Sequence, residues 1–307
     1  MRKNLLTGVS ITSPEPDGAS AVAFKFNTDS TYSTGGANLL RLSNNGTGVF
    51  DFSFQGGIDH VNSGASTAAH AQSLNLNWTA TSTRTSSGQY STVIGANCTA
   101  SGNYSVALGS GGISSGTRSF THGNFNIASS TDSVAMGNTN DCSGPASLVI
   151  GTDAVLTPVG AFGIGAGKFS SVGDAQIQIS TLRIATTDAT QTAMLTPDVL
   201  GKSRVTIPAD TSWVFSALII GRSDEADGND SGAYRIEGCL TRDESNNTAL
   251  VGSVTVTTIA ESAGATAWSV TATADDTNEA LAIQVTGEAA TNIRWVAKVD
   301  IAQVTYA

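Results

Sequence analysis

The stretch "SVALG" at residues 105–109 returns as "SVAMG" at 133–137, and "SFTHG" at 119–123 stands midway between them. A serine therefore recurs every 14 residues, and a glycine follows each serine by four residues. The serines are Ser91, Ser105, Ser119, Ser133 and Ser147, and the glycines are Gly95, Gly109, Gly123, Gly137 and Gly151. Ala161 and Gly165 continue the step into a sixth, degenerate copy. A short fixed period of this kind predicts a solenoid.

Small and larger residues alternate within each pentapeptide, which places them on opposite faces of a strand. The small set, such as Ala107 and Ala135, is expected to fill a thin interior. The larger set is expected to point outward, and it comprises Val106, Leu108, Phe120, His122, Val134, Met136, Leu148, Ile150, Phe162 and Ile164. A second small or apolar column, Ala100, Ser114, Ala128, Cys142 and Leu156, predicts another short strand in each turn. Fourteen residues thus predict one coil of a parallel β-roll, with two strands and two turns.

The outward set forms a continuous apolar stripe along the predicted roll. A stripe of that length on a single chain would be an interaction surface or an aggregation hazard. Packing against two further copies around a rotation axis buries every stripe at once. We therefore predict a homotrimer, with those ten outward residues as candidates for its interface.

The composition is that of a β-rich protein with many turns. Of 307 residues, 40% are hydrophobic, only 13% are charged and 33 are glycine. The net charge of −10 argues against a nucleic-acid partner, because phosphate binding needs a basic surface. No apolar run approaches the roughly 18 residues that span a bilayer, and the start lacks the pattern of a signal peptide. We expect a protein made in the cytoplasm that does not insert into membranes.

Five segments are predicted along the chain. Residues 1–20 form an N-terminal segment, and 21–85 form a small β-module with a connector, where "NNG" at 44–46 indicates a hairpin. The β-roll covers 86–166, and a connector covers 167–202. Residues 203–307 alternate in seven or eight stretches separated by turn residues, which predicts a jelly-roll-like antiparallel β-sandwich.

The residues offer little catalytic or metal-binding chemistry. His122 stands in an apolar slot of the repeat, where three copies could converge on an anion or water near the axis; the simpler interpretation is a locally hydrogen-bonded imidazole. The acidic run at 224–232 could supply calcium oxygens, but it lacks the EF-hand spacing and fits a solvated turn. The carboxylates of the roll are not aligned in its frame. We therefore predict no catalytic residue, no cofactor and no metal, and a protein that is not an enzyme.

Two parts of the sequence resemble known protein families. "GNYSVALGSGG" and "TDSVAMGNTN" resemble the 14-residue head repeats of trimeric autotransporter adhesins, whose left-handed parallel β-rolls trimerise. "ASAVAFKFNTDSTYSTGGANLLRLSNNGTGVFDFS" and "GDAQIQISTLRIATTDAT" are similar to modules of bacteriophage tail-fibre and other virion proteins. The second resemblance implies a virion component whose partners are its own copies and other virion proteins.

The expected function is that of a short phage tail fibre or spike that binds a glycan or protein receptor on the host surface. The candidate receptor contacts lie in turn-like segments, and they are Asp224, Asp227, Asp230, Asn246, Asn247, Asp276 and Asn278. Three alternatives remain open: a capsid-decorating head fibre or cement protein, a polysaccharide-degrading tailspike, and a bacterial surface adhesin.

Overall fold

The computed structural model describes the strands at 38–44, 47–53, 58–59 and 74–78, and then residues 86–196, 203–224 and 226–306. Predictions for residues 1–37 and for Glu225 of the acidic run lie outside this set. The predicted hairpin is present: β1 (Asn38–Asn44) pairs antiparallel with β2 (Thr47–Ser53). After the two-residue β3 (Ile58–Asp59), β4 (Leu74–Trp78) pairs in parallel with the first strand of the roll.

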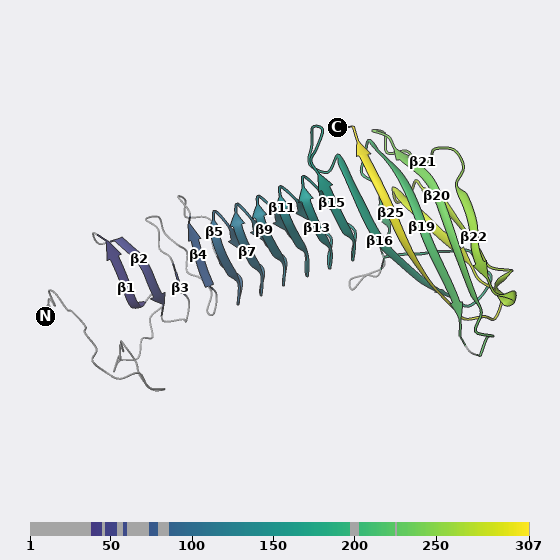
Figure 1. Cartoon of the computed structure of the whole chain (residues 1–307), viewed down its shortest axis with the longest axis horizontal. Helices are drawn as coiled ribbons and strands as arrows, with labels where there is room; N and C mark the ends of the chain where they lie inside the picture. Colours follow the sequence, from purple (N-terminus) through teal and green to yellow (C-terminus); the bar gives the residue numbers. More distant parts are fainter. Residues whose placement is uncertain are drawn as a thin grey trace, which may run out of the picture.

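The central segment is a parallel β-roll of two sheets, as the repeat predicts (Figure 1). Five-residue strands build one sheet: β5 (Thr92–Ala96), β7 (Val106–Ser110), β9 (Phe120–Asn124), β11 (Val134–Asn138), β13 (Leu148–Thr152) and β15 (Phe162–Ala166). Two-residue strands build the other: β6 (Thr99–Ala100), β8 (Ile113–Ser114), β10 (Ile127–Ala128), β12 (Asp141–Cys142) and β14 (Val155–Leu156). Neighbouring strands pair residues 14 apart throughout.

The interior of the roll is as thin as the alternation predicts. The small set and the second column are fully buried, with Ala107, Ala135, Ala128 and Cys142 among them. The repeating serine closes a turn, because the backbone N–H and the Oγ of a serine such as Ser105 both donate to a glycine carbonyl three residues earlier, at 3.2 and 2.6 Å.

The repeating glycine is required by both conformation and space. Gly137 has a φ of 115°, and a Cβ atom there would lie 2.0 Å from the carbonyl oxygen of Gly151 in the next coil. Only a residue without a side chain lets successive coils approach this closely.

Two buried asparagines tie successive coils together. The Asn140 Nδ2 donates to the carbonyl oxygens of Met136 and Gly151 at 2.9 and 2.8 Å, and its Oδ1 accepts from the Ala154 N–H at 3.0 Å. Asn126, one coil earlier, makes the equivalent three bonds, including one accepted from the Asn140 backbone N–H. These amides satisfy turn backbone groups that water does not reach.

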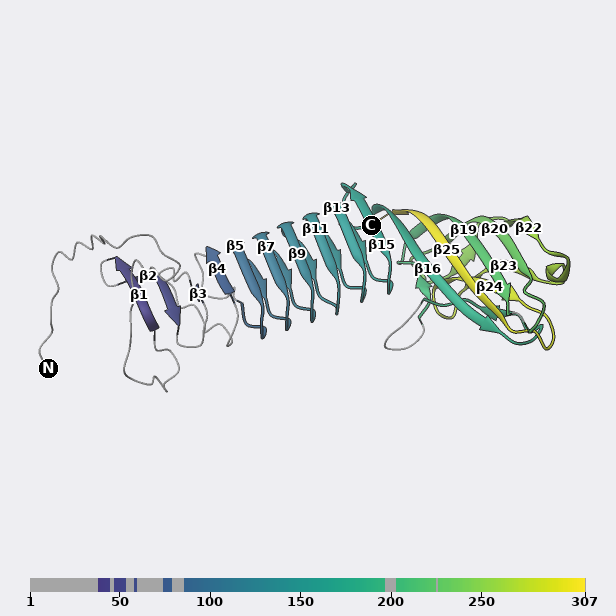
Figure 2. The same ribbon diagram turned by 60° about the horizontal axis from the view of Figure 1, so that its bottom comes forward.

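Antiparallel sheets form the C-terminal part, as expected (Figure 2). The large sheet contains β16 (Ala175–Thr186), β25 (Ile293–Thr305), β19 (Thr211–Ser223) and β20 (Ser231–Arg242), with β21 (Thr248–Leu250) and β22 (Thr255–Glu261) paired to β20. The small sheet contains β17 (Thr192–Ala193), β18 (Val205–Thr206), β23 (Ser269–Asp275) and β24 (Ala280–Thr286). Strand β16 pairs antiparallel with β15, so the large sheet continues that of the roll.

One hydrophobic core lies on the inner face of the large sheet. Trp213, Trp268 and Trp295 are buried in it, so these rings pack inside the protein. The strict alternation of buried and exposed residues along β19 and β25 leaves the opposite face of the sheet in solvent. That outer face continues the outward face of the roll.

Candidate functional site

All ten predicted interface residues of the roll lie on the outward face of its five-residue strands. None of them is buried, and His122 and Met136 are exposed, the latter by 37%. The strand register aligns one member of each strand into a single row, Ile94, Leu108, His122, Met136, Ile150 and Ile164. A second row runs beside it through Val106, Phe120, Val134, Leu148 and Phe162.

The first row does not end with the roll. Ile164 pairs with Ile177 of β16, Ile177 with Ala302 of β25, and Ala302 with Val214 of β19. Ile177 and Val214 are 46% and 60% exposed. We call the whole line, from Ile94 to Val214, the axial row. It is a run of outward side chains across nine paired strands, apolar except at His122.

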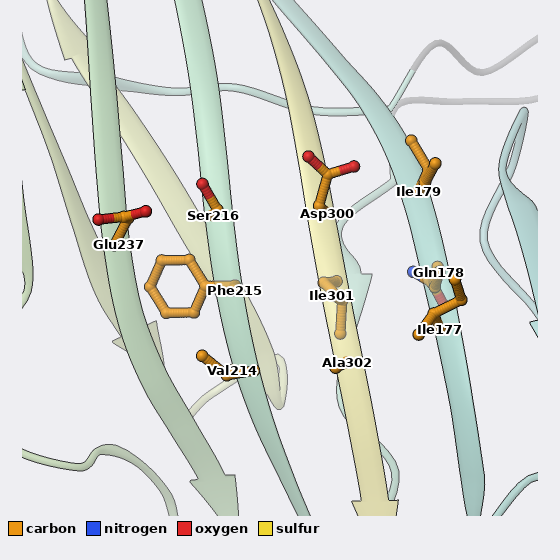
Figure 3. Close-up of a pocket in the computed structure, with 10 residues that line it drawn as sticks. All are labelled: Ile177, Gln178, Ile179, Val214, Phe215, Ser216, Glu237, Asp300, Ile301 and Ala302. Atoms are coloured by element: carbon orange, nitrogen blue, oxygen red, sulfur yellow. The ribbon is translucent and has the colours of Figure 1, made fainter.

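Sequence reasoning missed the C-terminal part of the axial row. Its residues line a shallow groove of about 550 Å³ on the outer face of the large sheet (Figure 3). Figure 3 shows Ile177, Ala302 and Val214 lying across three adjacent strands at one level, with Asp300 and Glu237 at the next. The alternation in "AQIQIS" at 175–180 was a detectable signal for an outward apolar set.

His122 is the one polar residue in the axial row, and it lies beside the ring of Phe120. Its ring lies 6.5 Å from that of Phe120, centroid to centroid, and its backbone carbonyl accepts the Asn126 amide. Among the described residues, no group of three or more His, Cys, Asp or Glu side chains is placed to hold a metal ion.

The other sheet of the roll also carries an outward column, Thr99, Ile113, Ile127, Asp141 and Val155. These residues are partly exposed. The Asp141 Oδ1 is buried without a hydrogen-bond partner among the described residues, and burial raises the pKa of this carboxyl. This second outward column is apolar at three of its five positions.

The seven candidate receptor residues are not brought together. Asp224, Asp227 and Asp230 lie in the loop between β19 and β20, whereas the other four lie in turns at the opposite end of these strands. There, Asp276 accepts the N–H of Thr248 beside the 242–248 turn.

All seven side chains hydrogen-bond with other residues of the chain, some within their own turn and some with a distant segment. The Asp227 Oδ2 accepts the Asn292 N–H at 2.7 Å, and the Asp230 Oδ1 accepts the Ser262 hydroxyl at 2.6 Å. At the other end, three amide side chains bond within their turns: Asn246 to Arg242, Asn247 to Asp243 and Asn278 to Asp275. A role in receptor contact remains a prediction for all seven.

A family model for the YadA head domain repeat matches residues 86–111 in two copies. No curated protein matches the chain. Among the described residues, no helix has the length and hydrophobicity to cross a membrane.

Three phage tailspike structures are similar to this chain at very low identity. Tailspike gp49 of Acinetobacter baumannii bacteriophage Fri1, a capsular polysaccharide depolymerase, is 10% identical, with 79% of this chain and 49% of that chain covered at a TM-score of 0.27. The Acinetobacter phage vB_ApiP_P1 tailspike is 9% identical over 76% and 50% at 0.20, and the Acinetobacter baumannii phage AM24 tailspike is 10% identical over 78% and 51% at 0.23. The chain thus spans about half the length of these structures.

The similarity to tailspikes corrects one prediction. The sequence led us to expect a protein that is not an enzyme, yet the Fri1 tailspike is a capsular polysaccharide depolymerase. The unaligned carboxylates on which that expectation rested belong to the roll alone, and they do not exclude catalysis elsewhere in the chain. The activity is that of the Fri1 protein, and TM-scores below 0.5 do not transfer it to this chain.

Proposed function

We propose that the protein is a homotrimeric appendage of a phage particle, a tail fibre or spike whose β-roll serves as a stiff shaft and whose C-terminal sheets meet the host surface. The observation that carries this proposal is the axial row. A line of exposed apolar side chains across the roll and the adjoining sheet is the surface that copies of one chain would bury around a shared axis.

The area of the outer face supports this length of contact. The long sheet of the roll has six strands that lie about 4.8 Å apart, and each strand is five residues long at about 3.3 Å per residue. The outer face of the roll therefore has an area of about 480 Å². A standard interface buries about 800 Å² on each partner. Four strands of the large sheet, taken over the same width, add about 320 Å². The roll and the sheet together therefore present about 800 Å² of outer face on each copy, which the proposed trimer would divide between two neighbours.

The oligomer is tested by light scattering on the wild type and on Ile150→Glu, whose neighbours in the axial row, Met136 and Ile164, are apolar. We expect a trimeric mass for the wild type and dissociation of the variant, because three carboxylates would be buried beside one another without partners. Thr131→Glu, at an exposed turn position of the same roll, is the matched control and should remain trimeric. A monomeric wild type would overturn the proposal.

The place of the protein on the particle is tested by immunogold labelling. Label at the tail supports the fibre or spike, and label on the capsid faces would assign the protein to the head. Incubating the trimer with host polysaccharide and measuring released reducing ends tests for catalysis. Release would make the protein a depolymerising spike.

A further inference from the structure

The outer face of the large sheet is apolar where the axial row crosses it and carries cationic side chains farther along its strands. The axial row crosses it at one end, near the start of β19 at Val214. Five cations lie on the same face farther along, and they are Arg183, Arg222, Arg235, Arg294 and Lys298. Arg222 is eight residues along β19 from Val214, a distance of about 27 Å. One third of the 15 Lys and Arg residues of an acidic chain thus gather on one sheet face.

Arg222 and Arg294 are directly opposite each other on β19 and β25. Cross-strand partners lie about 4.5–5.5 Å apart at Cβ, and like charges in that position repel. Among the described residues, neither guanidinium has a carboxylate within ion-pair distance. Arg222 donates one N–H to the Asn229 Oδ1, which is uncharged, and Arg294 makes no side-chain hydrogen bond with a described residue.

The two arginines line a cavity of about 490 Å³, within the usual range for ligand sites. Thr187, Asp224 and Asn292 complete its polar wall. The wall is held in place before any ligand arrives: the Asp227 Oδ2 accepts the backbone N–H and one side-chain N–H of Asn292, and the Asp224 Oδ1 accepts the Asp227 N–H.

We propose that this cavity binds a carboxylate-bearing sugar unit of a host surface polysaccharide. The inference rests on the proposed function and specifies the chemistry of its receptor. An anion placed between Arg222 and Arg294 relieves their repulsion and accepts paired N–H bonds from planar guanidinium groups. The hydroxyls of a sugar ring match the amide of Asn292, the carboxylate of Asp224 and the hydroxyl of Thr187. The acidity of the rest of the chain does not prevent binding, because charges beyond about 8–10 Å are screened at physiological salt.

The test uses the full chain and measures binding to polygalacturonate, colominic acid and neutral dextran. We expect binding to one or both acidic polymers, none to dextran, and weaker binding as salt is raised. Arg222→Gln and Arg294→Gln should each weaken binding at least about tenfold. Arg118→Gln removes the same charge from an exposed position in the roll and should leave binding unchanged.

Three results would overturn the proposal: undiminished binding by the Arg222→Gln/Arg294→Gln double variant, an equal loss in Arg118→Gln, or equal binding to single-stranded DNA. Trimer mass and binding of the labelled protein to host cells are measured on the same samples. If the double variant stays trimeric and binds cells as the wild type does, this inference fails and the proposed function stands. A wild type that neither trimerises nor binds cells would refute the proposed function itself.

Discussion

Replacing Asn140 by alanine is expected to lower the free energy of unfolding by about 3 kcal/mol. The side chain is 1% exposed and makes three hydrogen bonds of 2.8–3.0 Å to backbone groups of its own coil and the next. Each such bond contributes about 1 kcal/mol net, and a buried group that loses its partner adds a desolvation penalty. For a domain of 150–250 residues, a loss of this size lowers the Tm by roughly 6–12 °C.

The assay is guanidinium unfolding followed by circular dichroism, at one fixed protomer concentration because assembly contributes to stability. Asn124→Ala is the matched control. Asn124 donates to Asn138 at the surface, so its loss should cost less than about 0.5 kcal/mol. If Asn140→Ala loses under 1 kcal/mol, or if Asn124→Ala loses as much, buried amide bonding does not hold the coils together.

Further predictions concern backbone, thiols and acid. Gly137→Ala should prevent the roll from forming, seen as loss of protease resistance, because its Cβ would meet the next coil's backbone at 2.0 Å. Thr139→Gly should raise the unfolding free energy by about 1 kcal/mol, since a β-branched residue is strained at φ 56°. Burial raises the pKa of the Cys142 thiol to about 11, so in the native protein at pH 8 a thiol reagent should modify the partly exposed Cys239 and leave Cys142 unreacted until unfolding. Burial alone would raise the pKa of the Asp174 carboxyl, but backbone N–H groups of the 169–171 loop lower it overall. Its stabilising effect is therefore complete above about pH 4 and is lost as the pH falls, so the Tm gap between wild type and Asp174→Asn should close in acid.

The roll was predictable because its 14-residue step carries two independent constraints. The alternation within "SVALG" decides which side chains face inward, and the glycine that ends it marks where the next coil comes too close for a side chain. Both constraints are local, so a single sequence reveals them. The same holds for the strands within residues 203–307, whose alternation indicated their approximate number, whereas β16 lies in the segment predicted as a connector.

The hydrogen bonds that Asn126 and Asn140 make between successive coils could not be predicted from the 14-residue repeat. Five positions are equivalent in the frame, yet they hold Cys98, Gly112, Asn126, Asn140 and Ala154. Only two of these five positions hold an asparagine, so the sequence shows no repeated asparagine in this frame. Whether such a side chain bridges two coils or faces solvent depends on the turn conformation, which the sequence does not specify.

Features that depend on the pairing of distant segments also could not be predicted from the sequence. Arg222 and Arg294 lie far apart in the chain, and only the pairing of β19 with β25 makes them neighbours. The axial row likewise depends on the antiparallel pairing of β16 with β15, which sets Ile177 opposite Ile164. A shift of one residue in that register would turn Ile177 into the core and break the row.

The two proposed roles of the large sheet are compatible because the sheet is twisted. Adjacent strands rotate by about 20–25°, so the outer face cannot lie along one straight axis over its whole width and length. The end that the axial row crosses is the part that three copies could bring together at close range. The end with Arg222 and Arg294 would place six guanidinium groups against one another if it also met at the axis, and like charges so placed repel strongly once water is excluded. In the proposed trimer the twist would carry that end away from the axis into solvent, where the proposed cationic site would be open to an acidic glycan.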